Sequence, residues 1–295
     1  MPVGPERNWE DFTMNFSSIT RSRTARASGQ SLLLLAPEHV ALPGAFRKAR
    51  SDKHRYNQLL AKMQCFRGAT YVQDGAIAPE ALDSEGRHRL DIDLQSWHVL
   101  AVNGNEDVCG CSRYSSHRTS VDFSSLAVGR SAMARSDVWG TKLKSAVERE
   151  RRIAAEEDTS FVEVGGWAIS EQLRGTTEAL RIALATYALA HKLGGGIGVT
   201  TATVRHHSAK VLRKIGGTSL LEDSVEFPRY FDPEYDCEME ILRFHSATPN
   251  PKFLPWIEQI KLEMSTVEVL TARSNIRPEV CATADLSTTW AAAVA

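Results

Sequence analysis

Phe161-Val-Glu-Val-Gly-Gly-Trp-Ala-Ile-Ser170 opens the stretch that decides the fold of this chain. Its β-branched and apolar residues, bounded by polar ones, predict a strand. A polar turn follows at 171–178, and the segment 179–193 then carries apolar residues at helical spacing, which predicts a helix. Three glycines from Gly194 end that helix. A strand at 197–204 and a basic helix at 205–215 complete the order strand, turn, helix, strand, helix.

The turn between the first strand and the helix has the chemistry of an anion site. Backbone N–H groups at a helix start, together with the positive end of the helix dipole, attract phosphate. The turn resembles the Gln/Arg-x-x-Gly-x-Gly/Ala pattern of GNAT acyltransferases, with Gln172 and Gly175 matching and Thr177 in place of the final small residue. A plain turn with one glycine is the alternative. The resemblance implies donor-binding positions at Gln172, Arg174, Gly175, Thr176 and Thr177.

Composition limits the classes of protein that remain. The chain has 295 residues, 42% of them hydrophobic, and a net charge of −1, which argues against general nucleic-acid binding. Its five cysteines lack paired metal-ligand spacing, so we expect no metal site and reduced thiols in a cytoplasmic protein. The apolar run from Ser31 to Ala36 is too short for a membrane span or a leader. We expect a mobile or loosely docked arm at 1–45, in which Leu32 to Leu35 either add an edge strand or contact the core, one domain at 46–265 and a tail at 266–295.

The remaining elements follow from the same kinds of pattern. The sequence predicts helices at 46–71, 138–157 and 255–267, a hairpin of strands 97–102 and 108–114, and a strand at 237–245. The segment 121–137 gives no clear prediction.

A more specific resemblance rests on motifs spread over residues 60 to 245. The segment Gly110-Cys-Ser-Arg-Tyr114 resembles the Gly-Cys-x-Arg-Leu segment of acyl-homoserine-lactone synthases. The acidic pair Asp91 and Asp93 stands upstream, as in those enzymes, and Arg67 to Tyr71 resembles their Arg-x-x-x-Phe. Their Glu-x-Ser-Arg-Phe-x-Val strand corresponds to the segment from Glu163 to Ile169, which has two glycines in place of Ser-Arg. The related N-acyl amino acid synthases tolerate that change better.

This resemblance implies the fold and the reaction. The fold would be an α/β (α+β) GNAT fold, with a mixed central sheet whose strands splay in a V between flanking helices. The reaction would move a long-chain acyl group from acyl carrier protein or acyl-CoA to the amine of a small amino acid, giving an N-acyl amino acid, with no tightly bound cofactor. The alternatives are an acyl-homoserine-lactone synthase, an acetyl-CoA-dependent N-acetyltransferase and a non-catalytic binding module of the same fold. A long apolar tunnel beside the splay would separate fatty acyl donors from acetyl donors.

The resemblance also implies roles for individual residues. Glu163 would take the proton from the acceptor amine, with an internal salt bridge as the alternative. A backbone N–H between Trp167 and Ile169 would hold the oxyanion. The acceptor would meet a set of polar positions upstream, each of which could instead serve structural pairing or a solvated loop: Arg67, Tyr71, Asp91, Asp93 and Arg113.

The basic helix at 205–215 presents four cations, Arg205, Lys210, Arg213 and Lys214. Acyl carrier protein is acidic, so this face would attract it electrostatically, and a solvated surface helix is the alternative. Many GNAT enzymes have a tyrosine acid on this helix, and Arg213 stands in the corresponding place.

Overall fold

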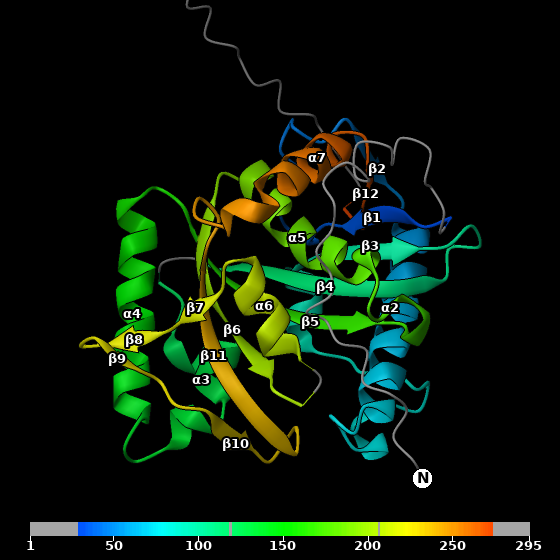
Figure 1. Ribbon diagram of the computed structural model, residues 1–295. Helices are drawn as coiled ribbons and strands as arrows, with labels where there is room; N and C mark the ends of the chain where they lie inside the picture. Colours follow the sequence, from blue (N-terminus) through cyan, green and yellow to red (C-terminus); the bar gives the residue numbers. More distant parts are fainter. Residues whose placement is uncertain (1–28, 118–119, 206, 274–295) are drawn as a thin grey trace, which may run out of the picture.

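One mixed sheet of ten strands forms the centre of the molecule (Figure 1). The computed structural model describes residues 29–117, 120–205 and 207–273. The sheet order is β10-β11-β6-β5-β4-β3-β1-β12-β2, and β7 also pairs with β11. The strands are β1 (Ser31–Leu35), β2 (Lys48–Ser51), β3 (Trp97–Val102), β4 (Val108–His117), β5 (Ser160–Ile169), β6 (Gly196–Thr203), β7 (Thr218–Ser219), β10 (Tyr230–Asp232), β11 (Cys237–His245) and β12 (Glu268–Thr271), beside a separate hairpin of β8 (Leu221–Glu222) and β9 (Val225–Glu226).

Helices cover both faces of the sheet. The helices are α2 (Lys53–Gln73), α3 (Ala127–Arg130), α4 (Gly140–Glu156), α5 (Thr177–Lys192), α6 (Ser208–Ile215) and α7 (Leu254–Met264). One face, here called the α5 face, is covered by α5, α6 and α7, and its core includes Val162 and Leu242. The opposite α2 face is covered by α2, α3 and α4, with Phe161 and Leu100 in its cores. These layers confirm the predicted mixed sheet between helices.

The central strands β5 and β6 are parallel at their starts and then diverge. Ser160–Glu163 of β5 pairs with Gly196–Val199 of β6. The pairing ends there, although β5 continues to Ile169 and β6 to Thr203. A Cβ on Gly198 would lie 1.9 Å from the carbonyl oxygen of Val162, so only glycine allows this close pairing at the closed end. The predicted V-shaped splay is therefore present, and it opens beyond Glu163.

A β-bulge lies on β5 where the strands have parted. Arg113 of β4 pairs with Gly165 and Cys111 pairs with Ala168, so two residues of β5 stand opposite one residue of β4. Gly166 has a φ of 60°, the left-handed conformation that glycine adopts without strain. Bulges leave backbone groups outside the regular ladder and often re-aim side chains at functional sites.

Both ends of the described chain belong to the sheet, which corrects two expectations. β1, predicted to lie in a mobile arm, is a buried inner strand between β3 and β12. β12, predicted to be part of the tail, pairs in parallel with β1 and β2. The rest of the predicted arm and tail, 1–28 and 274–295, lies outside the described residues.

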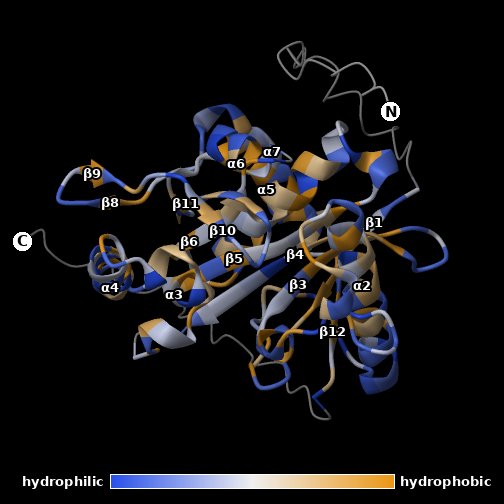
Figure 2. Ribbon diagram, turned by 90° about the horizontal axis from the view of Figure 1, so that it is seen from below, coloured by the Kyte–Doolittle hydropathy of each residue, from blue (hydrophilic) through white to orange (hydrophobic). Residues whose placement is uncertain are grey.

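Helix boundaries differ from expectation where local geometry intervenes. The predicted helix at 46–71 begins only at Lys53, because β2 precedes it and Asp52 caps it by accepting a hydrogen bond from the backbone N–H of Arg55. The basic helix begins at Ser208, after His207 with its φ of 60°. α4 shows the predicted charged character, and its outer side is hydrophilic, next to the projecting β8–β9 hairpin (Figure 2). Within the described ranges no helix has both the length and the apolar character to cross a membrane.

Candidate acyl-transfer site

The turn before α5 is open to solvent and ends in a capped helix start. Gln172, Arg174 and Thr177 are exposed, and Gly175 has a φ of 73°. The Thr176 hydroxyl accepts a hydrogen bond from the backbone N–H of Glu178, which leaves other first-turn N–H groups of this 16-residue helix free of intrahelical partners. The turn therefore has the geometry of an anion site beside the open end of the splay.

The one cation within this turn is already engaged. The guanidinium of Arg174 donates two hydrogen bonds, of 2.7 and 2.8 Å, to the carboxylate of Asp74, the residue that ends α2. This bidentate pair ties the turn to α2 and places a negative charge next to it. A phosphate at the turn would therefore depend on backbone N–H groups and would meet a repulsive carboxylate.

Asp74→Asn is expected to lower the KM for an acyl-CoA donor by about threefold, because the variant removes a carboxylate beside the phosphate site and releases Arg174. The measurement is donor KM at low ionic strength, and Arg174→Gln, which removes the cation instead, is the matched control and should raise it. Equal KM values for the two variants would contradict a phosphate site at this turn.

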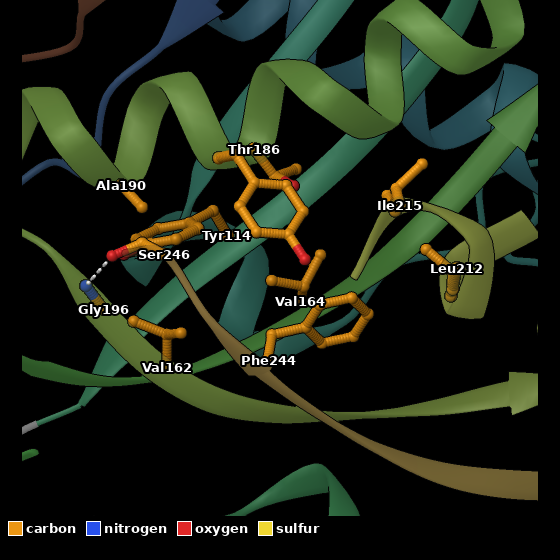
Figure 3. Close-up of a pocket in the computed structure, with 11 residues that line it drawn as sticks. Tyr114, Val162, Val164, Thr186, Ala190, Gly196, Leu212, Ile215, Phe244 and Ser246 are labelled. Carbon is orange, nitrogen blue, oxygen red and sulfur yellow. Dashed lines mark hydrogen bonds between the residues drawn. The ribbon is translucent and has the colours of Figure 1, made fainter. Parts of the chain in front are cut away.

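A pocket opens on the α5 face at the closed end of the splay (Figure 3). It has about 370 Å³ of empty space, counting its opening to solvent. Val162 and Val164 reach it from β5, and Val164 is the first β5 residue beyond the last pair with β6. Its other lining residues come from β4, β6, β11, α5 and α6: Tyr114, Gly196, Phe244, Ser246, Thr186, Tyr187, Ala190, Leu212 and Ile215. The pocket is largely apolar and meets the splay where the strands part.

On the α2 face, a buried arginine and a buried aspartate form a closed pair. Both side chains of Arg67 and Asp93 are 0% exposed, and the guanidinium donates hydrogen bonds of 3.0 and 2.8 Å to the two carboxylate oxygens. Gln64 and the backbone N–H of Leu90 also donate to Asp93. Burial works to raise the pKa of Asp93, but the Arg67 guanidinium outweighs it and holds that pKa well below its usual range. Asp93 is therefore a charged, saturated acceptor.

Arg113 lies beside this pair with little to neutralise it. It is 8% exposed, and its Nε and Nη1 atoms have no hydrogen-bond partner. Its nearest carboxylate oxygen belongs to Asp93, 3.7 Å from Nη1, and Asp93 already holds Arg67. Burial and the neighbouring Arg67 lower the pKa of Arg113. A buried guanidinium with unsatisfied donors is a receptor for an anion.

The two glycines that replace Ser-Arg make room for these arginines. A Cβ on Gly165 would lie 3.4 Å from Arg113 Nη2, and one on Gly166 would lie 3.5 Å from Arg67 Nη1. Tyr71 approaches the same bulge, and its hydroxyl donates to the carbonyl oxygen of Trp167 at 3.4 Å. The arginine pair therefore lies against the bulge, on the side of the sheet opposite the pocket.

Glu163 lies at the point of divergence but is held by several partners. Its carboxylate accepts hydrogen bonds from the backbone N–H groups of Ala127 (3.1 Å) and Val128 (2.9 Å), and His117 Nε2 lies 3.0 Å away. Burial works to raise its pKa, but the His117 contact and the two N–H donors outweigh it and lower that pKa. The side chain points to the α2 face, whereas Val162 and Val164 point into the pocket.

The structure brings together some of the predicted acceptor residues and separates one. Arg67, Tyr71, Asp93 and Arg113 meet near the bulge. Asp91 is exposed, because 91–95 forms a tight helical turn rather than a strand, and two-residue spacing does not align side chains there. Sequence reasoning missed Gln64, which donates to Asp93, and the tyrosines of the pocket. Only the helical spacing of Tyr187 on an apolar face could have indicated its burial.

The cations of the basic helix have unequal surroundings. Arg213 donates to the Glu240 carboxylate at 2.7 Å, and Arg205 lies 3.7 Å from an Asp236 oxygen. Lys210 and Lys214 are exposed and have no ion pair among the described residues. These two lysines are the cations available to an acidic partner. In the described part of the chain, no cluster of three His, Cys, Asp or Glu residues is arranged to hold a metal ion.

Several solved protein structures resemble this chain in fold. The CoA-dependent acyl-homoserine lactone synthase BjaI, solved with SAM and isopentyl-CoA, is 12% identical, with a TM-score of 0.50 over 83% of this chain and 95% of that chain. The CoA-dependent acyl-homoserine lactone synthase MesI is 17% identical (TM-score 0.47; 82% of this chain, 99% of that chain). FeeM, an N-acyl amino acid synthase from uncultured soil microbes, is 13% identical (TM-score 0.40; 74% and 91%).

No protein-family model matches the sequence, and no curated protein matches it. The likeness is therefore one of fold. The chain has a GNAT-like fold and resembles the acyl-homoserine lactone synthase BjaI in its architecture.

Proposed function

We propose that the chain is a cytoplasmic N-acyltransferase that moves an acyl group from acyl carrier protein or acyl-CoA to the amine of an amino acid. One observation carries the proposal. Where β5 and β6 diverge, an apolar pocket lies on the α5 face of the sheet. Arg113, whose charge is only partly neutralised, lies on the α2 face. The four described cysteines are free thiols, in keeping with a reducing compartment.

The pocket and the gap suit a thioester donor. The acyl chain would lie in the pocket, and the thioester would lie in the gap beside Val164. The pantetheine phosphate would meet the N–H groups at the start of α5. Lys210 and Lys214 would then attract an acidic carrier protein to the same entrance.

Arg113 suits an acceptor that carries a carboxylate. Its planar guanidinium can donate two parallel hydrogen bonds to such a group. Because Asp93 is saturated by Arg67, an incoming carboxylate would not compete with a strong internal pair. The acceptor amine would then approach the gap from the α2 face, opposite the acyl chain.

The reaction needs few protein groups. The neutral amine attacks the thioester carbonyl carbon, the new C–N bond forms, and the C–S bond breaks as the thiolate leaves. The proton lost by the nitrogen returns to the thiolate through water. A backbone N–H freed by the bulge between Trp167 and Ile169 would hold the oxyanion.

A second candidate is an acyl-homoserine-lactone synthase. S-adenosylmethionine carries the same carboxylate and amine as a free amino acid, so Arg113 would receive either one.

The deciding experiment is mass spectrometry of products from the purified full chain. The assay supplies acyl-CoA or acyl carrier protein thioesters with a mixture of amino acids, and in parallel with S-adenosylmethionine. We expect an N-acyl amino acid. An acyl-homoserine lactone would establish the second candidate, and no product with any donor would leave a binding module of the same fold.

Glu163→Gln tests the role of Glu163, whose assignment as the base stays a prediction. A catalytic base contributes about 100-fold or more, whereas an anchor for α3 contributes to stability. Its lowered pKa and its backbone N–H partners favour the anchor. We therefore expect kcat to stay within about tenfold of the parent protein and the melting temperature to fall. A 100-fold loss of kcat without a change in melting temperature would establish the base instead.

A further inference from the structure

Two tyrosine hydroxyls in the pocket have no hydrogen-bond partner. Tyr114 is 1% exposed and Tyr187 is 4% exposed, and neither hydroxyl finds a partner in the described structure. A phenylalanine would fill the same volume at each position without a buried, unsatisfied hydroxyl, which is costly. Because these two hydroxyls line a pocket rather than a closed core, a polar partner that enters the pocket would satisfy them.

The hydroxyls lie at identifiable places in the pocket wall. Tyr114 extends from β4 to the start of β6, where a Cβ on Gly196 would lie 2.6 Å from its oxygen. Ser246 is at the same end, and its hydroxyl oxygen accepts the backbone N–H of Gly196 at 2.9 Å (Figure 3). The hydroxyl of Tyr187 lies near Gly216, at the end of α6, where a Cβ would come within 2.8 Å of it.

The end of the pocket that carries Tyr114 and Ser246 is remote from the point where β5 and β6 diverge. Gly196 pairs with Ser160 at the closed end of β5 and β6, whereas Val164 lies just beyond the last pair at the other end of the pocket. An acyl chain that enters beside Val164 would therefore bring its distal end to Tyr114 and Ser246. The wall between them is apolar and aromatic, with Phe244 at 6.0 Å from the Tyr187 ring.

We propose that the pocket selects an acyl group that carries an oxygen, a hydroxyl or a carbonyl, at its distal end. This inference rests on the proposed function and names its donor class. The Tyr114 hydroxyl hydrogen-bonds that oxygen, and a plain alkyl chain leaves it unsatisfied. Sites built to hydrogen-bond a substrate hydroxyl discriminate strongly against analogues that lack it.

The test compares two donors that differ by one oxygen, hexanoyl-CoA and ω-hydroxyhexanoyl-CoA. Calorimetry on the full chain gives the dissociation constants and needs no acceptor. We expect the hydroxylated donor to bind roughly tenfold more tightly, the effect of one or two added hydrogen bonds. In Tyr114→Phe this ratio should fall severalfold toward one.

Tyr56→Phe is the matched control. Tyr56 is a fully buried tyrosine whose hydroxyl also lacks a partner, but it lies in the core of the α2 face, outside the pocket. Its variant should keep the parent ratio. Equal binding of the two donors by the parent protein, or an unchanged ratio in Tyr114→Phe, would overturn the inference.

The same donors separate this inference from the proposed function. Acyl transfer at equal rates from both would leave the N-acyltransferase intact and remove the oxygen-bearing donor. Binding with the expected preference but without transfer to any acceptor would uphold the donor class in a protein that only binds it. No binding of either donor would remove both proposals.

Discussion

Arg113→Met should abolish acylation of amino acids and at the same time raise the melting temperature. Arg113 is buried, has unsatisfied Nε and Nη1 atoms, and shares its one nearby carboxylate with Arg67. Without a ligand, this charge opposes folding, and an apolar side chain of similar length removes the cost, by about 1 kcal/mol or more. With an acceptor present, the loss of a buried charge-assisted pair should reduce kcat/KM by about 100-fold or more.

The measurement combines thermal unfolding with steady-state kinetics. A gain of 1 kcal/mol corresponds to roughly 2 °C or more for a protein of this size. Arg113→Lys is the control, because it keeps the charge but loses the planar fork, and it should keep part of the activity without the gain in stability. A methionine variant that keeps full activity would remove Arg113 from the acceptor site. One that unfolds several degrees earlier would assign it to structure alone.

The opposite signs of these two effects are what distinguish a binding residue from a structural one. Functional sites often lower the stability of the folded protein, and an unpaired buried charge is one way in which they do so. Arg67 offers a contrast within the same cluster, because its guanidinium is fully paired with Asp93.

Local sequence patterns were sufficient for the centre of the fold. The alternation before Ser170, the turn at Gly175 and the glycines after Leu193 each determine local geometry, and β5, α5 and β6 lie within about two residues of prediction. β11 was predicted at its observed bounds for the same reason. Strand geometry also requires Glu163, which stands between Val162 and Val164, to face away from their pocket.

Local sequence patterns could not predict which distant strands pair. β1 is a strand because it lies between β3 and β12, and β12 is more than 230 residues along the chain. A short apolar run such as Leu32 to Leu35 fits an arm equally well until its partner is known. The pocket had the same difficulty, because its tyrosines come from β4 and α5, and neither the motif that contains Tyr114 nor the helical spacing of Tyr187 reveals that they meet. The resemblance placed Arg67, Asp91 and Asp93 together in an acceptor site, whereas the Arg67–Asp93 ion pair and the exposure of Asp91 depend on a turn that no spacing revealed.

Arg67→Met should destabilise the fold by about 3 kcal/mol or more, the second large effect that the structure predicts. The variant leaves the Asp93 carboxylate fully buried, with only Gln64 and the backbone N–H of Leu90 to hold it. Breaking a buried ion pair on one side costs far more than replacing both partners. The measurement is urea unfolding, where the midpoint should fall while the slope stays constant.

The double variant Arg67→Met with Asp93→Leu is the internal control for this prediction. It removes both charges, so it should recover most of the lost stability, although each single variant is unstable. Arg113 limits how far the single variant falls, because it lies 3.7 Å from Asp93 and can move closer once Arg67 is gone. That movement would occupy the anion receptor with an internal carboxylate, so the single variant should also lose acceptor binding. A double variant no more stable than Arg67→Met would show that the pair stabilises through packing rather than charge.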